Sequence, residues 1–425
     1  MTDSIIKRPR VLVLAQNKIQ PFTGGGVLLS NLFSDFESQN LLFVHRDKNY
    51  EYESGKREIK VGASWLRLKP INFLKSLYKY INLAFKNPLR IRLNHLFKLF
   101  LQSCYFHFPE LEDKQICSFS PHVIYAWVSD CFWARSVIET AARYNVPYVI
   151  HFMDNHIETN SRSLSDLILK DDFTKLLNKV NKNADRLYVI SESMKLEYSK
   201  RWKKKCEVFH GLIDYELWPW PNINKQSDDG LFRIAFTGSA ESGQIKGLRI
   251  IAESIARISK NSQFNIKLIL YLTESYASLV KPHMADFSFV EFRPHPNFSN
   301  LRTELASVDA LLLAYGTDAE TINYYRYSFA TKIVPYMMSG RAIFVYGPVE
   351  IEPVAYAKRD SWAKVCSSEQ SNDIDESLKT FIKNFDERMI MAEKAWHEGC
   401  NEHDLKFNAN RFSESLLSIV NKKKN

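Results

Sequence analysis

The strongest constraint on the fold is a regular alternation of apolar strands and helices, in two series along the chain. PRVLVLAQN at 9–17 is a continuous apolar run, and TGGGVLLSNLFSDF follows it at 23–36. In the second segment Val27, Leu28, Leu32 and Phe36 have helical spacing. Strands buried on both faces have such uninterrupted apolar runs and occur in parallel sheets. The pattern therefore predicts a doubly wound α/β domain.

Further strand and helix segments continue the first series. HVIYAWV precedes a helix expected at about Cys131–Tyr144, and PYVIHFMD precedes a polar loop. ADRLYVISESMKLEYSKR reads as strand, turn and helix, and CEVFHGLIDYELW as a strand and its exit. The second series contains the strands LFRIAFT, FNIKLILYL, FSFVEFRP, DALLLAY and RAIFVYG, with helices expected from IKGLRIIAESIARI and NLRTELASV.

The break between the two series is WPWPNINKQSDDG, Trp218 to Gly230, whose prolines and polar residues are typical of a linker. With 425 residues the chain exceeds one ordinary core. We predict a domain at 1–217, a linker at 218–230, a domain at 231–395, and a C-terminal helix at 396–425 that packs back on the first domain. Open α/β sheets bind ligands beyond the carboxyl ends of their strands, so two such domains would face a central cleft.

Composition narrows the class of protein. Apolar residues make up 45% and charged residues 25% of the chain, as in soluble globular proteins. No run of about 20 apolar residues predicts a membrane span, and the N-terminus is too polar for a signal peptide. The six cysteines form no C-x-x-C pair, which favours a reducing cytoplasm over a zinc site or a disulfide framework. The net charge of +9 favours an anionic partner.

The segment YSFATKIVPYMMSGRAIFVYGP, Tyr327 to Pro348, places polar residues just before an apolar helix and a strand. Free backbone N–H groups at a helix start favour an anion, Ser328 and Thr331 add hydroxyl donors, and Lys332 adds a charge. The alternative is a capped helix with Lys332 in solvent. The glycines at 24–26 would let a ligand approach a helix start closely. The alternative is a tight turn between strand and helix, because the third glycine of the dinucleotide-binding pattern G-x-G-x-x-G is missing.

Taken in order, these motifs resemble the retaining two-domain (GT-B) glycosyltransferases of the group-1 or family-4 type. ADRLYVISESM resembles their "ADR-strand-SE/ST" segment, and HGLIDYELW their "NGVD-x-x-x-F" segment. FTGSAESGQIKG is similar to their "GR…KG" donor loop, and SFATKIVPYMMSGRAIFVYGP to their donor motif SFPSKIFEYMAAGRPILAYGP. The resemblance covers nearly the whole chain and implies two Rossmann-like domains that transfer a sugar from a nucleotide-diphosphate sugar to a glycan or lipid-linked hydroxyl.

The resemblance also implies a set of site residues. Lys246 would neutralise the leaving diphosphate, and Asp154 would lie beside the reacting groups. No metal and no cofactor beyond the nucleotide sugar is implied. The donor would be bound by Gly24, Gly25, Gly26, Gly238, Ser239, Lys246, Phe292, Arg293, Tyr327, Ser328, Thr331 and Lys332. Independently of the resemblance, Asp130, His151 and Asp154 are candidates to bind the acceptor because they lie at strand ends on the cleft side of the sheet, although a carboxylate there can equally be a helix cap.

The sequence departs from the family pattern at four positions. Tyr327 and Pro335 stand where the family has two glutamates, Ser239 where it has an arginine, and His210 where it has an asparagine. These departures leave two alternatives open: a catalytically silent binding subunit of a glycan-assembly complex, and a nucleotide-sugar epimerase of the same architecture.

Other patterns point to no chemistry of their own. The D-x-D at 373–375 opens a helix, where acidic residues suit the dipole, and is not expected to bind metal. GSAESG lacks the G-x-S-x-G spacing of hydrolases, and no H-E-x-x-H occurs.

The stretch from Ile59 to Pro109 holds nine Lys or Arg and no Asp or Glu. Leu74, Leu77, Ile81 and Phe85 have helical spacing within it, with lysines on the adjacent face. Such a basic amphipathic helix suits an anionic membrane surface, and the alternative is a helix with a solvated basic rim. Nucleic acid is not expected, because no recognised binding motif accompanies the charge. We predict a cytoplasmic protein peripheral to the inner face of the membrane.

Overall fold

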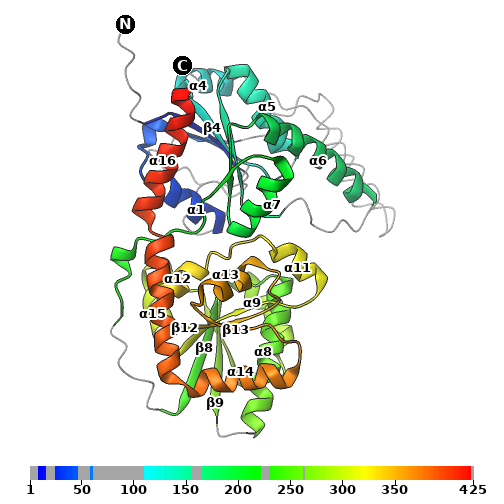
Figure 1. Cartoon of the computed structure of the whole chain (residues 1–425), viewed down its shortest axis with the longest axis vertical. Coiled ribbons are helices and arrows are strands. Elements are labelled where there is room, and N and C mark those ends of the chain that lie inside the picture. Colours follow the sequence, from blue (N-terminus) through cyan, green and yellow to red (C-terminus); the bar gives the residue numbers. More distant parts are fainter. Residues whose placement is uncertain are drawn as a thin grey trace. The chain divides into compact units, whose positions relative to one another are not determined.

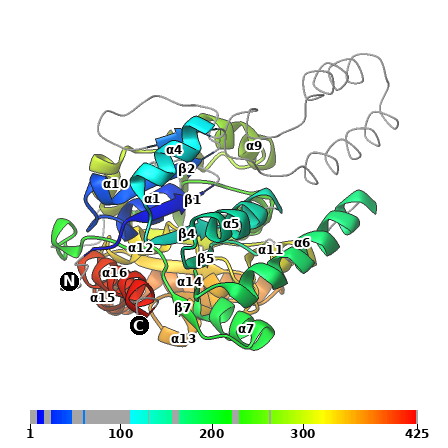
Figure 2. The ribbon, with the colours of Figure 1, turned by 90° about the horizontal axis from the view of Figure 1, so that it is seen from above.

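The computed structural model describes residues 8–15, 24–45, 58–60, 110–129, 131–155, 164–221, 229–261 and 264–422 (Figures 1 and 2). The chain forms two compact units, each described by itself. Unit 1 comprises 1–190, 194–209 and 409–425, and unit 2 comprises 191–193 and 210–408. The predicted basic helix within 59–109 lies almost wholly outside the described residues, as does Asp130.

Unit 1 is built on a parallel sheet of seven strands in the order β3-β2-β1-β4-β5-β6-β7. The strands are β1 Val11–Leu14, β2 Leu41–His45, β3 Glu58–Lys60, β4 Val123–Trp127, β5 Tyr148–Phe152, β6 Arg186–Val189 and β7 Cys206–Val208. Its described helices are α1 Gly24–Leu32, the short η1 Ser38–Asn40, α4 Glu110–Phe119, α5 Cys131–Tyr144, α6 Leu164–Asn183, α7 Glu192–Trp202 and most of α16 Leu405–Lys422. Helices α5 and α6 lie side by side in both views (Figures 1 and 2).

The C-terminal part of α16 completes the core of unit 1. The ring of Phe412 meets the rings of Phe33, Tyr125 and Phe209 edge to face, at centroid distances of 5.1, 5.7 and 5.2 Å. On the same helix, Ser415 Oγ lies 2.7 Å from the hydroxyl of Tyr188. Aromatic pairs of this kind each add about 1 kcal/mol beyond area burial. Residues more than 200 positions apart in sequence therefore share one core.

Unit 2 contains a parallel sheet of six strands in the order β10-β9-β8-β11-β12-β13. The strands are β8 Leu231–Thr237, β9 Asn265–Leu272, β10 Val290–Pro294, β11 Ala310–Ala314, β12 Ala342–Tyr346 and β13 Lys364–Cys366. Its described helices are η3 Tyr215–Leu217, α8 Ser242–Asn261, α9 Glu274–Met284, α10 Phe298–Ala306, α11 Ala319–Tyr325, α12 Ile333–Met337, α13 Glu352–Asp360, α14 Ser371–Lys383, α15 Phe385–Glu402 and the start of α16.

Strand alternation divides the core of unit 2 into two layers. Phe232, Ile234 and Phe236 of β8 share one cluster with α8, α9 and α14. Successive strand side chains point to opposite faces, so the intervening residues face the other layer. There α15 packs against α12 and β12, on the side of unit 2 away from α8 (Figure 1). Both faces are covered, which explains why these strands are continuous apolar runs.

The predicted α/β class with two doubly wound parallel sheets is confirmed. The single C-terminal helix expected at 396–425 is instead the end of α15 and the whole of α16, which are separated at His403–Asp404. The interruption has a long-range cause, because Ile213 N–H donates to His403 O and Leu405 N–H donates to Ile213 O. The same two bonds tie Ile213 to the segment at His403 and Leu405 within unit 2, and residues 210–217 belong to unit 2.

Among the described helices, none is long and apolar enough to span a bilayer.

Candidate functional site

The strand order of unit 2 reverses between β8 and β11, and open α/β sheets bind ligands at such a switch point. Gly238 follows β8 there and Gly316 follows β11. Gly238 has a φ of +88°, which a side chain would strain, and its N–H donates to Tyr271 O at 2.9 Å. The backbone thus turns sharply after β8, and the missing side chain of Gly238 leaves room for neighbouring side chains at the switch point.

Helix α8 sits directly on the end of β11 because two of its residues lack side chains. A Cβ on Gly247 would lie 2.3 Å from Tyr315 N, and one on Gly243 would lie 2.7 Å from Thr321 Cγ2. Gly316 N–H donates to Gly243 O at 2.7 Å, which closes the contact. Gly247, the residue after Lys246, therefore allows α8 to pack closely on the end of β11. This packing brings Lys246 to the end of that strand.

Lys246 belongs to the segment that resembles the family's donor loop, and it lies in the second turn of α8, which begins at Ser242. Its Nζ lies 3.0 Å from Asp318 Oδ1, and 44% of its side chain is exposed. Asp318 caps α11 by accepting from Thr321 N–H and Thr321 Oγ1. Burial would raise the pKa of Asp318, but the hydrogen bonds from Thr321 and Lys246 outweigh it and lower the pKa. Lys246 thus has an exposed ion pair that a stronger anion could replace.

Lys332 is buried, with 9% of its surface exposed. Its Nζ donates to Ser239 O at 2.8 Å and lies 3.6 Å from the centroid of the Phe236 ring. Tyr336, one turn further along, fixes this geometry because its hydroxyl accepts from Thr237 N–H at 2.8 Å. An ammonium has three donors, and among the described residues Lys332 pairs with no carboxylate. Burial lowers the pKa of Lys332 well below its ordinary value.

His295, which the sequence did not single out, lies beside Lys332. It directly follows β10, and its N–H donates to Leu272 O at 3.0 Å, which continues the ladder with β9. A Cβ placed on Gly238 would lie 3.9 Å from Lys332 Nζ and 4.0 Å from His295 Nε2. Two basic groups therefore converge on one glycine. No sequence motif marks His295, because its neighbours come from segments 57 and 37 positions away.

The helix that was expected to present an anion site is short. Helix α12 spans only the five residues Ile333–Met337, so its dipole carries little weight. Ser328 Oγ donates to Tyr324 O at 3.0 Å, and Tyr327 is buried. Thr331 is exposed. The prediction that this segment binds an anion now depends on Lys332 and not on the helix start.

Phe292 and Arg293 lie on β10, at the edge of the sheet. Phe292 packs against the core cluster of unit 2. Arg293 bonds to Glu291 Oε1 at 2.5 Å and to the Tyr271 hydroxyl at 3.0 Å. Both side chains have structural partners, so a contact with a base would have to come from the backbone, as the family resemblance implies.

In unit 1 the glycines at 24–26 form the first turn of α1 and not a turn before it. A Cβ on Gly25 would lie 2.5 Å from Trp127 Cη2. The close approach at Gly25 is thus to the protein's own indole ring. Gly26 is buried in the same turn.

His151 is fully buried in β5, with Nδ1 2.6 Å from the Tyr125 hydroxyl and Nε2 3.1 Å from Phe209 O. Burial lowers its pKa to about 3. With both ring nitrogens engaged and no exposed surface, His151 has the geometry of a core residue, and we do not retain it as an acceptor ligand. Asp154 lies two residues beyond β5 and is half-buried, at the carboxyl edge of the sheet. Asp130 lies outside the described residues.

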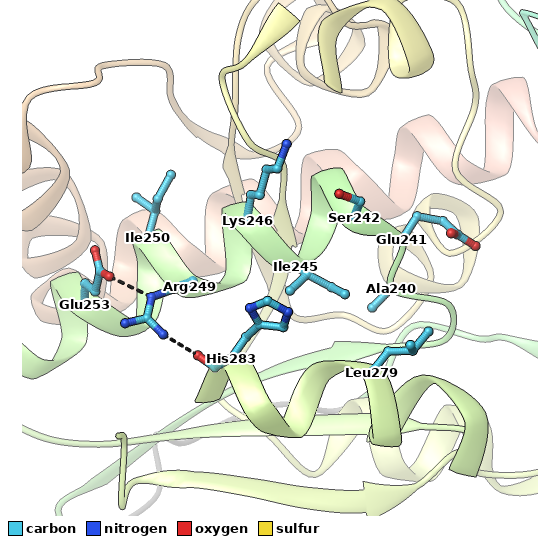
Figure 3. A pocket seen from close by; sticks show the side chains of 10 residues that line it. All are labelled: Ala240, Glu241, Ser242, Ile245, Lys246, Arg249, Ile250, Glu253, Leu279 and His283. Atoms are coloured by element: carbon cyan, nitrogen blue, oxygen red, sulfur yellow. Dashed lines mark hydrogen bonds and ion pairs between the residues drawn. The ribbon is translucent and has the colours of Figure 1, made fainter. Parts of the chain in front are cut away.

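A cavity of about 550 Å³, with Lys246 among its lining residues, lies between α8 and α9. Figure 3 shows Arg249 bonded to Glu253 and to the backbone of His283, with Lys246 extending away from the α9 side chains. The walls combine these charged groups with apolar residues such as Ile245 and Leu279. In the part of the chain that the structure describes, no cluster of His, Cys, Asp or Glu could hold a metal ion. Asp375 of the D-x-D accepts from Ser254 and Arg257.

No protein-family profile matches the sequence, and no curated protein matches it. Solved structures do match along the whole chain. A glycosyltransferase from Rickettsia africae has a TM-score of 0.65 at 11% identity, covering 98% of this chain and 99% of that one. Sucrose-phosphate synthase from Thermosynechococcus elongatus has a TM-score of 0.64 at 10% identity, covering 97% and 100%. Anabaena HepE, solved with UDP-glucose, has a TM-score of 0.62 at 12% identity, covering 96% and 99%.

This chain has the GT-B fold. Within that fold, unit 2 corresponds to the domain for which the sequence predicted nucleotide-sugar binding. Its switch point carries Gly238, Lys332 and His295, with Lys246 at the neighbouring strand end.

Proposed function

We propose that this protein is a glycosyltransferase that binds a nucleotide-diphosphate sugar at the switch point of unit 2. The observation that carries the proposal is Lys332, a buried amine with one hydrogen bond, no carboxylate partner among the described residues, and a direct approach to Gly238. A buried cation is costly unless an anion pairs with it. A diphosphate would supply that anion.

The solved neighbours support this choice of ligand. HepE was solved with UDP and with UDP-glucose, and a trehalose-6-phosphate synthase was solved with UDP-2-fluoro glucose. These proteins share the fold with this chain. The switch point of unit 2 carries the basic groups of Lys332 and His295, which suit a diphosphate. We extend the nucleotide sugar to this chain on those two grounds.

In the proposed reaction the bond between the anomeric carbon and the diphosphate oxygen breaks, and a bond from that carbon to an acceptor oxygen forms. The electron pair of the broken bond stays on the diphosphate. Lys332 and Lys246 would stabilise the charge that develops there, which is the largest contribution a protein makes to such a step. The proton of the acceptor hydroxyl would pass to the departing phosphate. Asp154 would orient the acceptor.

The finer features remain part of the proposal. Retention of configuration, a hexosyl donor and independence from metal rest on the family resemblance alone. A lipid-linked or polysaccharide acceptor, a role in cell-surface glycan synthesis, and a place at the inner face of the membrane depend on the basic stretch at 59–109. The amphipathic helix predicted within that stretch lies outside the described residues.

A second function, the catalytically silent binding subunit, is favoured by one observation. The two family glutamates are replaced by Tyr327, which is buried, and by Pro335, which lies inside α12. Neither residue supplies a carboxylate for a sugar or a ribose. This alternative retains the donor site but predicts no turnover.

The experiment is calorimetric titration with UDP, GDP, UDP-glucose and GDP-mannose on three proteins: wild type, Lys332→Met and the control Lys260→Met. Lys260 is exposed near the end of α8, far along the helix from the switch point. We expect one nucleotide class to bind wild type and the control equally, and Lys332→Met about 100-fold more weakly. Binding that is unchanged in Lys332→Met would remove the basis of the proposal.

Turnover then separates the two functions. Hydrolysis or transfer from the bound nucleotide sugar, followed as release of nucleoside diphosphate with a panel of glycosyl acceptors, supports the enzyme. Tight donor binding without release, together with stable association with another transferase, supports the silent subunit.

A further inference from the structure

We propose that His295 is a second donor-binding residue, and that the nucleotide sugar binds together with a proton taken up by this histidine. The inference rests on the proposed function of the same site. It concerns a residue at which the sequence resemblance implied no contact.

Geometry places His295 at the site. Its Nε2 and Lys332 Nζ both lie within about 4 Å of the position that a side chain on Gly238 would occupy, at 4.0 and 3.9 Å. The backbone of His295 is fixed at the end of β10 by its bond to Leu272 O of β9, and its ring approaches Gly238, which follows β8 on the other side of β9. A phosphate oxygen that reached Lys332 beside Gly238 would be within reach of the imidazole as well.

The other charges around His295 are already paired. On β10, Glu291 pairs with Lys267 and with Arg293. On β9, the Tyr271 hydroxyl donates to Glu304 of α10 at 2.8 Å and accepts from Arg293. The remaining charged group that acts on His295 is Lys332, which precedes α12. Two basic groups thus face one space, and among the described residues neither of them pairs with a carboxylate.

This arrangement makes the histidine respond to an anion. His295 is exposed at the surface, but partial burial of its ring lowers its pKa, and the nearby Lys332 lowers it further, against a raising hydrogen bond at Pro296. The ring is therefore neutral near pH 7 without ligand. A diphosphate would favour the charged ring and raise its pKa. The bound state then holds more protons than the free state, so affinity should fall as pH rises.

The test is calorimetry with UDP-glucose and, in parallel, GDP-mannose, between pH 6 and 8. Both phosphates of a nucleotide sugar are esterified, so the ligand lacks the ionisation near pH 6 of a terminal phosphate. Titrations in two buffers with different ionisation enthalpies count the protons taken up. The variant is His295→Gln, which keeps a hydrogen-bond donor without the charge. The matched control is His283→Gln, an exposed histidine of α9 in the same unit.

We expect wild type and the control to take up about half a proton or more per ligand near pH 7, with affinity falling about threefold or more per pH unit. His295→Gln should bind about tenfold more weakly at pH 6 and lose most of the proton uptake. Ligand binding without proton uptake in wild type, or an unchanged His295→Gln, would overturn the inference and leave the donor site standing. If neither nucleotide sugar binds wild type, the inference and the proposed function fail together.

Discussion

Lys332 of unit 2 and His151 of unit 1 are both basic, both buried, and both beside an aromatic ring at a parallel sheet. They differ in how completely their nitrogens are bonded. His151 has a partner at each ring nitrogen, a tyrosine hydroxyl and a backbone carbonyl. Lys332 has one carbonyl for three donors. Buried polar groups are normally satisfied, so an incompletely bonded one indicates a missing partner.

This contrast distinguishes His151 from Lys332, although the sequence predicted that both residues bind substrate. Both were predicted to contact substrate from their position at a strand end or before a helix. The structure gives His151 the role of joining β4, β5 and the segment at Phe209. It gives Lys332 one hydrogen bond and places its Nζ near Gly238, at the switch point. Four experiments can break or sharpen this contrast.

The largest effect should come from Lys246→Ala, because it removes a charge from the side of the site where the leaving diphosphate lies. We expect kcat to fall about 100-fold, or about 2.7 kcal/mol of transition-state stabilisation, with a smaller change in KM. Steady-state rates of nucleoside diphosphate release measure it. Lys260→Ala on the same helix is the control, and full turnover in Lys246→Ala would exclude this lysine from the chemistry.

His151→Phe should act on stability and not on catalysis. The change leaves the Tyr125 hydroxyl and Phe209 O without their partner, which costs about 2 kcal/mol of unfolding free energy. Urea denaturation measures this cost, and the rate per folded molecule should stay unchanged. Loss of turnover at full stability would instead return His151 to the acceptor site.

Lowering the pH should destabilise the wild type through the same residue. Burial lowers the pKa of His151 to about 3, whereas a histidine in the unfolded chain titrates near its ordinary value. Between these two pKa values the unfolded chain binds one proton more. The unfolding free energy should therefore fall by about 1.4 kcal/mol for each pH unit below about 6.

His403 in unit 2 should add to this slope, because burial and the adjacent His210 lower its pKa in the same direction. Denaturation of wild type and His151→Phe from pH 7 to 5 isolates the contribution of His151. Equal slopes in the two proteins would show that His151 titrates normally in the folded state.

The smallest effect is expected for Asp318→Asn. Asparagine also caps helices, so α11 should persist, and an exposed ion pair contributes less than about 1 kcal/mol. Removing the competing carboxylate beside Lys246 should tighten UDP-glucose binding by at most about threefold at low salt. The gain should shrink at 0.5 M salt, because exposed charges are screened. Weaker binding would mean that Asp318 positions Lys246 for the ligand.

Most of the fold could be predicted from the sequence, because strands that are buried on both faces of a parallel sheet are recognisable as apolar runs. The strands VLVL of β1 and ALLLA of β11 are uninterrupted apolar runs with fully buried side chains. The division of the C-terminal helix could not be predicted, since it depends on hydrogen bonds from Ile213, about 190 residues earlier.

The candidate site could be predicted in part. The resemblance directed attention to Lys332 and Lys246, and the structure brings Lys332 to Gly238. The burial of Lys332 over Phe236 could not be predicted, because the two residues are 96 positions apart. His295 gave no signal at all, since a single histidine after a strand is not a motif. The sequence shows which residues are basic, but it does not show that Lys332 and His295 both lie near Gly238.

The position of Phe412 has a consequence for synthesis of the chain. A ribosome releases the N-terminus first, so Phe33, Tyr125 and Phe209 emerge long before the ring that fills the space among them. Unit 2 is nearly continuous, from 210 to 408, and can finish folding while unit 1 still lacks its last helix. The domain made first is thus completed last. Until α16 emerges, the nascent chain lacks the ring that packs among Phe33, Tyr125 and Phe209.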